Sequence, residues 1–89
     1  MQPNVKSSWS YAPPDVQSVS TMRGLHIGHA HAMRCAAYYR SWATPGSLFF
    51  TQRNAADGIW WAKLSLLDAG AYRAEIERRN NGVACAEEE

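Results

Sequence analysis

The chain has 89 residues, of which 46% are hydrophobic and 11% aromatic, so it suits one folded domain and not a disordered chain. Its formal net charge is +1, although Glu87, Glu88 and Glu89 together hold three of its eight acidic residues. The rest of the chain is mildly basic, which falls short of the basic stripe of a dedicated nucleic-acid binder. We predict a single domain over 1–89, with a folded core at 5–82 and an acidic tail at 83–89.

No run of apolar residues approaches the roughly 20 needed to cross a bilayer, and the first residues lack the hydrophobic core of a signal peptide. We therefore expect a cytoplasmic protein. Cys35 and Cys85 would then be free thiols, because reducing compartments disfavour disulfides.

Residues 5–11 alternate apolar or aromatic with polar side chains, a period of two that predicts a short strand. Pro13 and Pro14 end this strand, because proline cannot donate a hydrogen bond to a neighbouring strand. Asp15 and Ser20 both suit the N-cap position of the helix that follows.

The most regular apolar spacing lies between residues 21 and 42. Its positions alternate steps of four and three, which places them on one face of an α-helix. They are Thr21, Leu25, Gly28, Ala32, Cys35, Tyr39 and Trp42. The run Thr44-Pro45-Gly46 predicts the end of this helix.

Residues 47–53 and 59–64 have the composition of β-strands, and the turn residues at 54–58 predict a hairpin between them. One face of this hairpin would pack on the core. The other face would mix aromatic and basic side chains; it comprises Phe49, Thr51, Arg53, Ile59, Trp61 and Lys63.

Ser65 and Asp68 match a capping box and predict a second helix over 65–80. Asn81-Gly82 predicts its end. The element order β-α-β-β-α indicates an α+β fold, a small two-layer sandwich in which a long central helix packs on a short sheet containing the β-hairpin.

Within the second predicted helix, Glu75 lies within one turn of both Arg78 and Arg79. Charged residues three and four positions apart form ion pairs on a helix surface. We therefore expect Glu75 on the exposed side of this helix.

Residues 24–30, GLHIGHA, spell HIGH at positions 26–29. This run resembles the HIGH signature of class I aminoacyl-tRNA synthetases and related nucleotidyltransferases. The segments 11–14 and 63–65 are loosely similar to other parts of that family's pattern. The resemblance implies that His26 and His29 contact ATP phosphates, with Lys63 as a further phosphate ligand, in a nucleotide-binding or adenylyl-transfer site.

The sequence also departs from that family. Leu66 stands where the family's second signature carries an essential lysine, and about ten residues separate Pro14 from the HIGH letters, where the family has almost none. A Rossmann-type catalytic domain needs more parallel strands than this chain supplies. We therefore rank a nucleotide-binding remnant below a non-enzymatic function, and we predict no catalytic residues and no cofactor.

The same histidines raise the question of a metal site. At about 100° per residue, His26 and His29 point away from His31 and Cys35 on a continuous helix, so the four cannot bind one zinc ion. His31, Cys35 and Cys85 form a three-ligand set without an evident fourth ligand. We favour Cys35 as a small core residue and predict no metal site.

The mixed face of the predicted hairpin is the remaining candidate site. We predict that it binds a protein or nucleoprotein partner, because it combines residue types enriched at interaction hot spots: Phe49, Arg53, Ile59, Trp61 and Lys63. Small size, many aromatic residues and the lack of a catalytic constellation are also typical of phage-encoded inhibitors of host machinery, including anti-CRISPR proteins. RNA binding through the same face is a further alternative, as is its burial beneath Trp9 and Tyr11.

Overall fold

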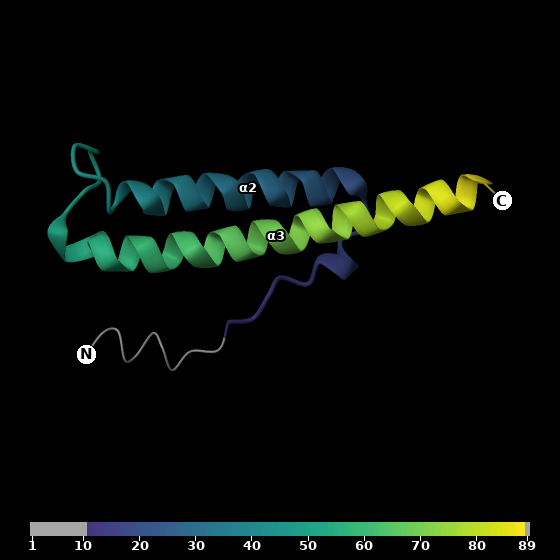
Figure 1. The fold of residues 1–89 in the computed structure, drawn as a ribbon, viewed down its shortest axis with the longest axis horizontal. Helices are drawn as coiled ribbons and strands as arrows, with labels where there is room; N and C mark the ends of the chain where they lie inside the picture. Colours follow the sequence, from purple (N-terminus) through teal and green to yellow (C-terminus); the bar gives the residue numbers. More distant parts are fainter. Residues whose placement is uncertain (1–10, 89) are drawn as a thin grey trace.

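The fold was obtained as a computed structural model that describes the backbone of residues 11–88 and the side chains of residues 11–82. Its helical elements are the 3-10 helix η1, Val16–Ser18, and the α-helices α2, Met22–Ser41, and α3, Gln52–Glu88. α2 and α3 lie side by side and antiparallel, and α3 continues well past the start of α2 (Figure 1). The described part of the chain contains no strand, so the predicted α+β sandwich is wrong and the fold is an α-helical hairpin.

The helix predicted from the apolar spacing at 21–42 is confirmed as α2. Its N-cap is Thr21, whose Oγ1 accepts a hydrogen bond from the Gly24 amide at 2.9 Å, in place of either predicted cap. The chain turns after α2 in the region that the sequence predicts. Gly46 has a φ of 94°, a backbone conformation that is strained for residues with a Cβ and that glycine adopts readily.

The predicted β-hairpin is wrong, because residues 52–64 form the first part of α3. The Thr51 Oγ1 accepts a hydrogen bond from the Asn54 amide at 3.1 Å and so satisfies one of the free donors at the start of α3. Aromatic and β-branched residues in this stretch favour a strand locally, but packing against α2 stabilises the helix more strongly.

Two further boundary predictions are wrong. Ser65 lies inside α3 and caps no helix, and Asn81-Gly82 does not end α3, which continues to Glu88. The strand predicted at 5–11 lies outside the described residues except for Tyr11, which belongs to no strand.

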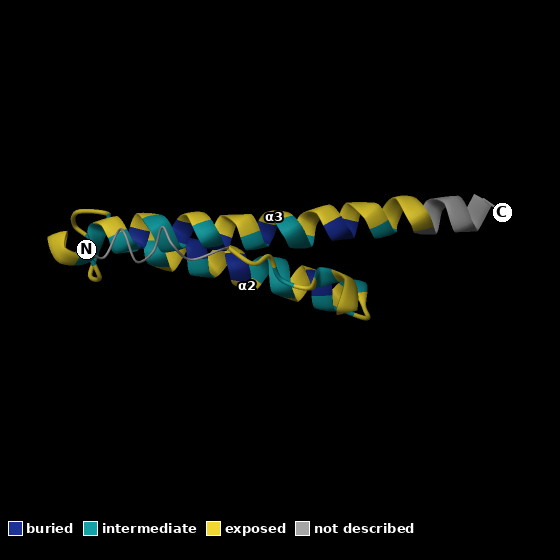
Figure 2. Ribbon diagram, turned by 90° about the horizontal axis from the view of Figure 1, so that it is seen from below, coloured by how far each residue is buried: buried dark blue, intermediate teal, exposed yellow. Residues whose placement is uncertain are grey.

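The interface between α2 and α3 is lined mainly by small side chains. Its buried apolar residues are Leu25, Ala32 and Ala36 on α2 and Ala62, Ala69 and Ile76 on α3. Figure 2 shows them as dark blue bands where the two helices face each other. Leu25 is the only large side chain among the described residues that is fully buried. The core is therefore thin, and alanine allows the two helix backbones to approach closely.

Two glycines mark the closest approaches. The ring of Tyr72 lies over Gly28, in the space that a Cβ at residue 28 would need. A Cβ at Gly58 would lie 2.5 Å from the Tyr39 carbonyl oxygen and 2.6 Å from the Trp42 Cβ. Both positions require glycine at the present spacing of the helices, because neither neighbour leaves room for a methyl group.

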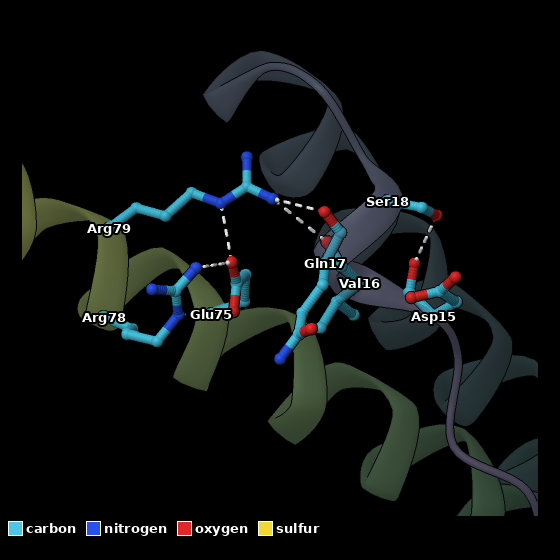
Figure 3. A network of polar contacts seen from close by, with 7 residues as sticks. All are labelled: Asp15, Val16, Gln17, Ser18, Glu75, Arg78 and Arg79. Atoms are coloured by element: carbon cyan, nitrogen blue, oxygen red, sulfur yellow. Dashed lines mark hydrogen bonds and ion pairs between the residues drawn. The ribbon is translucent and has the colours of Figure 1, made fainter.

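A group of charged residues near the C-terminal half of α3 holds η1 (Figure 3). Arg79 Nε donates to Glu75 Oε2 at 2.7 Å, and Arg79 Nη2 donates to the carbonyl oxygens of Val16 and Gln17, each at 3.2 Å. Arg78 also donates to both oxygens of Glu75, at 2.9 and 2.5 Å. This network fixes the start of the segment that leads into α2.

The predicted pairing of Glu75 with both arginines is confirmed, but its predicted exposure is wrong, because Glu75 is only 4% exposed. Hydrogen bonds from Arg78 and Arg79 lower the pKa of Glu75 to about 2, against the opposing effect of burial. Glu75 is therefore ionised in the folded protein over nearly the whole working range of pH.

Candidate functional site

One side of the hairpin carries a surface that we call the basic flank, formed by Arg40 of α2 with Ile59, Lys63 and Leu66 of α3. These side chains surround a hollow of about 220 Å³ that also touches Ala62. Ile59 is 63% exposed and Leu66 is 39% exposed. At about 100° per residue, positions 59, 63 and 66 point in nearly the same direction from a helix. Exposed apolar surface and two positive charges thus lie together.

A second hollow of about 220 Å³ contains His26 and His29 of the HIGH run, together with Arg73, Ile76 and Glu77 of α3. Arg73 lies seven residues beyond Leu66 and therefore on the same side of α3. Its guanidinium is already engaged, since Arg73 Nε donates to Glu77 Oε2 at 3.4 Å.

The hollow beside His26 and His29 does not include Lys63, the third phosphate ligand that the class I synthetase resemblance implies. Lys63 and Arg73 are ten residues apart on α3, which is about 15 Å along a helix. The fold that the resemblance implies is also wrong, because residues 11–88 contain no sheet. The residues of the HIGH run form part of a helix that packs on α3 and is preceded by no described strand.

The structure separates the five residues predicted to bind a partner. Ile59 and Lys63 lie together on the basic flank. Trp61 lies on the opposite side of the hairpin, where its ring stacks on Tyr39 with centroids 5.9 Å apart. Phe49 is exposed in the connection between the helices, with its ring edge-on to Tyr38, and Arg53 is exposed in the first turn of α3.

The separation follows from the change of secondary structure. Residues two apart share a face of a strand, but they differ by about 200° in direction on a helix. Sequence reasoning missed Arg40 and Leu66, which lie beside Ile59 and Lys63 in the structure. Residues seven positions apart lie on the same side of a helix. If residues 52–64 are assigned to a helix, the spacing of Ile59 and Leu66 predicts that the two side chains are neighbours.

The opposite side of the hairpin contains a larger hollow, of about 410 Å³, that we call the aromatic groove. Three aromatic rings from both helices line it, those of Tyr39, Trp61 and Tyr72. Its polar side chains are His31, Cys35, Ser65 and Asp68, and the segment Tyr11–Pro14 borders it.

The hydroxyl group of Tyr11 donates a hydrogen bond to Asp68 Oδ1 at 2.6 Å and so ties the N-terminal segment to α3. Partial burial, together with this hydrogen bond and the negative charge of Asp68, raises the pKa of Tyr11 to about 12. The phenol is therefore neutral, and the contact is intact, at physiological pH.

Cys35 and His31 lie one helical turn apart at the edge of the aromatic groove, with Cys35 Sγ and His31 Nε2 3.4 Å from each other. Cys35 is half-buried and not part of the buried core, contrary to the prediction. No group of three metal-ligating side chains occurs among the described residues, and Cys85 of the considered ligand set lies outside the described side chains.

No protein-family model, no curated protein and no solved structure matches this chain. In the part of the chain that the structure describes, no helix combines the length and the apolar character needed to cross a membrane. The two surfaces of the hairpin, the basic flank and the aromatic groove, are the candidate functional sites of the described chain.

Proposed function

We propose that the protein is a non-enzymatic interaction module that binds a partner protein through the basic flank. The observation that carries this proposal is the pair of exposed apolar side chains, Ile59 and Leu66, next to the charged groups of Arg40 and Lys63. Apolar anchors beside arginine are the combination from which binding hot spots are built.

The thin core supports the same proposal. Four of the six buried apolar residues in the described chain are alanines, while larger apolar side chains remain exposed along both helices. Helices normally bury their apolar faces against another layer of structure. A partner that supplies a third helix or a sheet would cover the basic flank and add the missing layer.

The charges of the basic flank indicate the chemistry of the partner surface. Neither Arg40 nor Lys63 takes part in a salt bridge among the described residues. An apolar ridge bordered by aspartate or glutamate would complement both the hollow and its charges, because guanidinium groups pair with carboxylates in a fixed geometry. A second copy of the same flank would instead bring like charges together, which opposes self-association there.

The test compares two neighbouring leucines. Leu66 belongs to the basic flank, whereas Leu67 is 46% exposed and lies about 100° away around the helix. Immobilised wild-type protein, Leu66→Asp and Leu67→Asp are used to capture proteins from an extract of the organism that encodes the chain, with quantification by mass spectrometry. We expect a partner retained by wild type and Leu67→Asp, and reduced at least about tenfold by Leu66→Asp, as for the loss of a hot spot.

Two outcomes would contradict the proposal. Equal capture by all three proteins would remove the basic flank from the interface, provided that circular dichroism shows equal helix content. Loss of capture after nuclease treatment would show that the flank binds nucleic acid and not protein. For a captured enzyme, we further expect its activity to fall on addition of wild type but not of Leu66→Asp, as for an inhibitor of phage type.

A further inference from the structure

We propose that the aromatic groove is a binding site for a small organic ammonium cation, held against aromatic rings and the carboxylate of Asp68. This site lies on the side of the hairpin opposite the basic flank and is independent of the proposed protein partner.

The dimensions and the walls of the groove fit such a ligand. Its volume of about 410 Å³ lies within the range of small-molecule sites, roughly 300–1,000 Å³. The rings of Tyr39, Trp61 and Tyr72 line it from both helices. The electron-rich faces of such rings attract quaternary and other organic ammonium groups, and tryptophan does so most strongly.

The charge in the groove selects a cation. Among the described residues that line it, Asp68 is the only carboxylate, and none is a lysine or an arginine. Glu75 and Glu77 each form an ion pair with arginine, but Asp68 forms none in the described chain. Asp68 Oδ1 accepts the hydrogen bond from the Tyr11 hydroxyl, and Oδ2 is the oxygen that a ligand would contact. The carboxylate of Asp68, which has no cationic partner in the part of the chain that the structure describes, is thus held in the same groove as three aromatic rings.

Ser65 supplies a second polar group in the groove. It is 9% exposed and lines the groove from the middle of α3. A ligand that carries a hydroxyl or an N–H group beside its cationic centre would bring that group to Ser65 while its positive charge faces Asp68.

Choline and its neutral isostere 3,3-dimethyl-1-butanol give a direct test, because they share shape and hydroxyl group and differ only in charge. Each is titrated into ¹⁵N-labelled full-length protein, and the indole N–H signal of Trp61 is followed by NMR. We expect saturable shifts with choline at a dissociation constant on the order of 1 mM, and binding of the isostere weaker by about tenfold.

Matched variants assign the charge effect to one carboxylate. Asp68→Asn keeps an acceptor for Tyr11 but removes the charge, and we expect it to weaken choline binding by about tenfold. Glu77→Gln removes a carboxylate on the other side of the hairpin and should leave the affinity for choline unchanged. The NMR spectrum of each variant reports whether the fold is intact.

Equal affinities for choline and the isostere would overturn the proposal, because the groove would then bind apolar ligands without regard to charge. Shifts that do not saturate at about 100 mM choline would also overturn it, since such binding is weaker than that of a built site. The comparison of the two ligands uses wild-type protein and stays decisive even if Asp68→Asn fails to fold.

Discussion

Glu75 helps to link α3 to η1, because its carboxylate accepts hydrogen bonds from Arg78 and Arg79, and Arg79 in turn donates to carbonyl groups of η1. Its pKa is lowered from 4.5 to about 2. A group whose pKa is depressed on folding stabilises the folded state above its unfolded pKa and loses that effect as the pH falls through its folded pKa.

We therefore expect the stability of the wild-type protein to decline as the pH falls from about 4.5 to about 2. Urea unfolding followed by circular dichroism at several pH values measures this slope. Glu75→Gln should be less stable at neutral pH and should show a flatter slope in the acidic range. Glu77→Gln, which removes an exposed carboxylate on the same helix, should keep the wild-type slope.

Gly58 allows a second test at the scale of one residue. Alanine at this position would press its Cβ against the Tyr39 carbonyl group and Trp42. We expect Gly58→Ala to lower the free energy of unfolding by about 1–3 kcal/mol, as for overpacked cores. Gly70, on the same helix, has no heavy atom within 4 Å of an added Cβ. Gly70→Ala should therefore raise stability by about 0.5–1 kcal/mol, and a loss there would contradict the packing described.

At the scale of elements, α2 could be predicted because its apolar spacing is regular over 20 residues. The first and last positions of that spacing, Thr21 and Trp42, are the residues that cap the helix. The start of α3 could not be predicted, because residues 59–61 favour strand by composition, while Gly58, Ala62 and Ser65 are too weakly apolar to show a helical stripe. These three residues follow one another at steps of four and three. The spacing identifies a helix face only once the small residues of α2 that pack against it are known. Of the basic flank, Ile59 and Lys63 were therefore among the predicted site residues, whereas Arg40 and Leu66 were not.

Gly46 and Gly82 were each predicted to lie where a helix ends, and only Gly46 lies outside a helix in the structure. Gly46 has a φ of 94°, but Gly82 lies within α3 and an added Cβ would meet nothing within 4 Å. We expect Gly46→Ala to cost about 1–2 kcal/mol, and Gly82→Ala to be neutral or stabilising by up to about 1 kcal/mol. Thermal and urea unfolding of the two variants measure these effects. A loss of stability in Gly82→Ala would contradict the helical conformation at residue 82 and would support the helix end that the sequence predicts there.

At the scale of the whole molecule, the protein is a single layer of two helices with extents of 56 × 30 × 15 Å. Its radius of gyration is 16.5 Å. A compact domain of this length has a radius of gyration of about 12 Å, as expected for the sandwich that the sequence first suggested. Elongation leaves both sides of the helix pair accessible, which is why one hairpin presents two separate surfaces.

This shape can be measured in solution. Small-angle scattering at low concentration should give a radius of gyration near 16.5 Å and the mass of one chain, and circular dichroism should show a helical spectrum. A value near 12 Å would contradict the extended hairpin. The mass of two chains would show that a second copy covers one of the exposed surfaces, which the charges of the basic flank disfavour.

The two glycine contacts have a consequence for changes in chain length. Gly28 of α2 and Trp42, which caps the C-terminal end of α2, are 14 residues apart, and their counterparts Tyr72 and Gly58 on α3 are also 14 residues apart. This separation is four helical turns, or about 21 Å, in both helices. Inserting or deleting one residue between either pair would rotate one contact by about 100° relative to the other, so the two could not form together. Insertions should therefore be tolerated in the connection at 43–51 and should destabilise the fold between the two contacts. Between the contacts, the number of residues constrains the sequence more than the identity of the small side chain at each position.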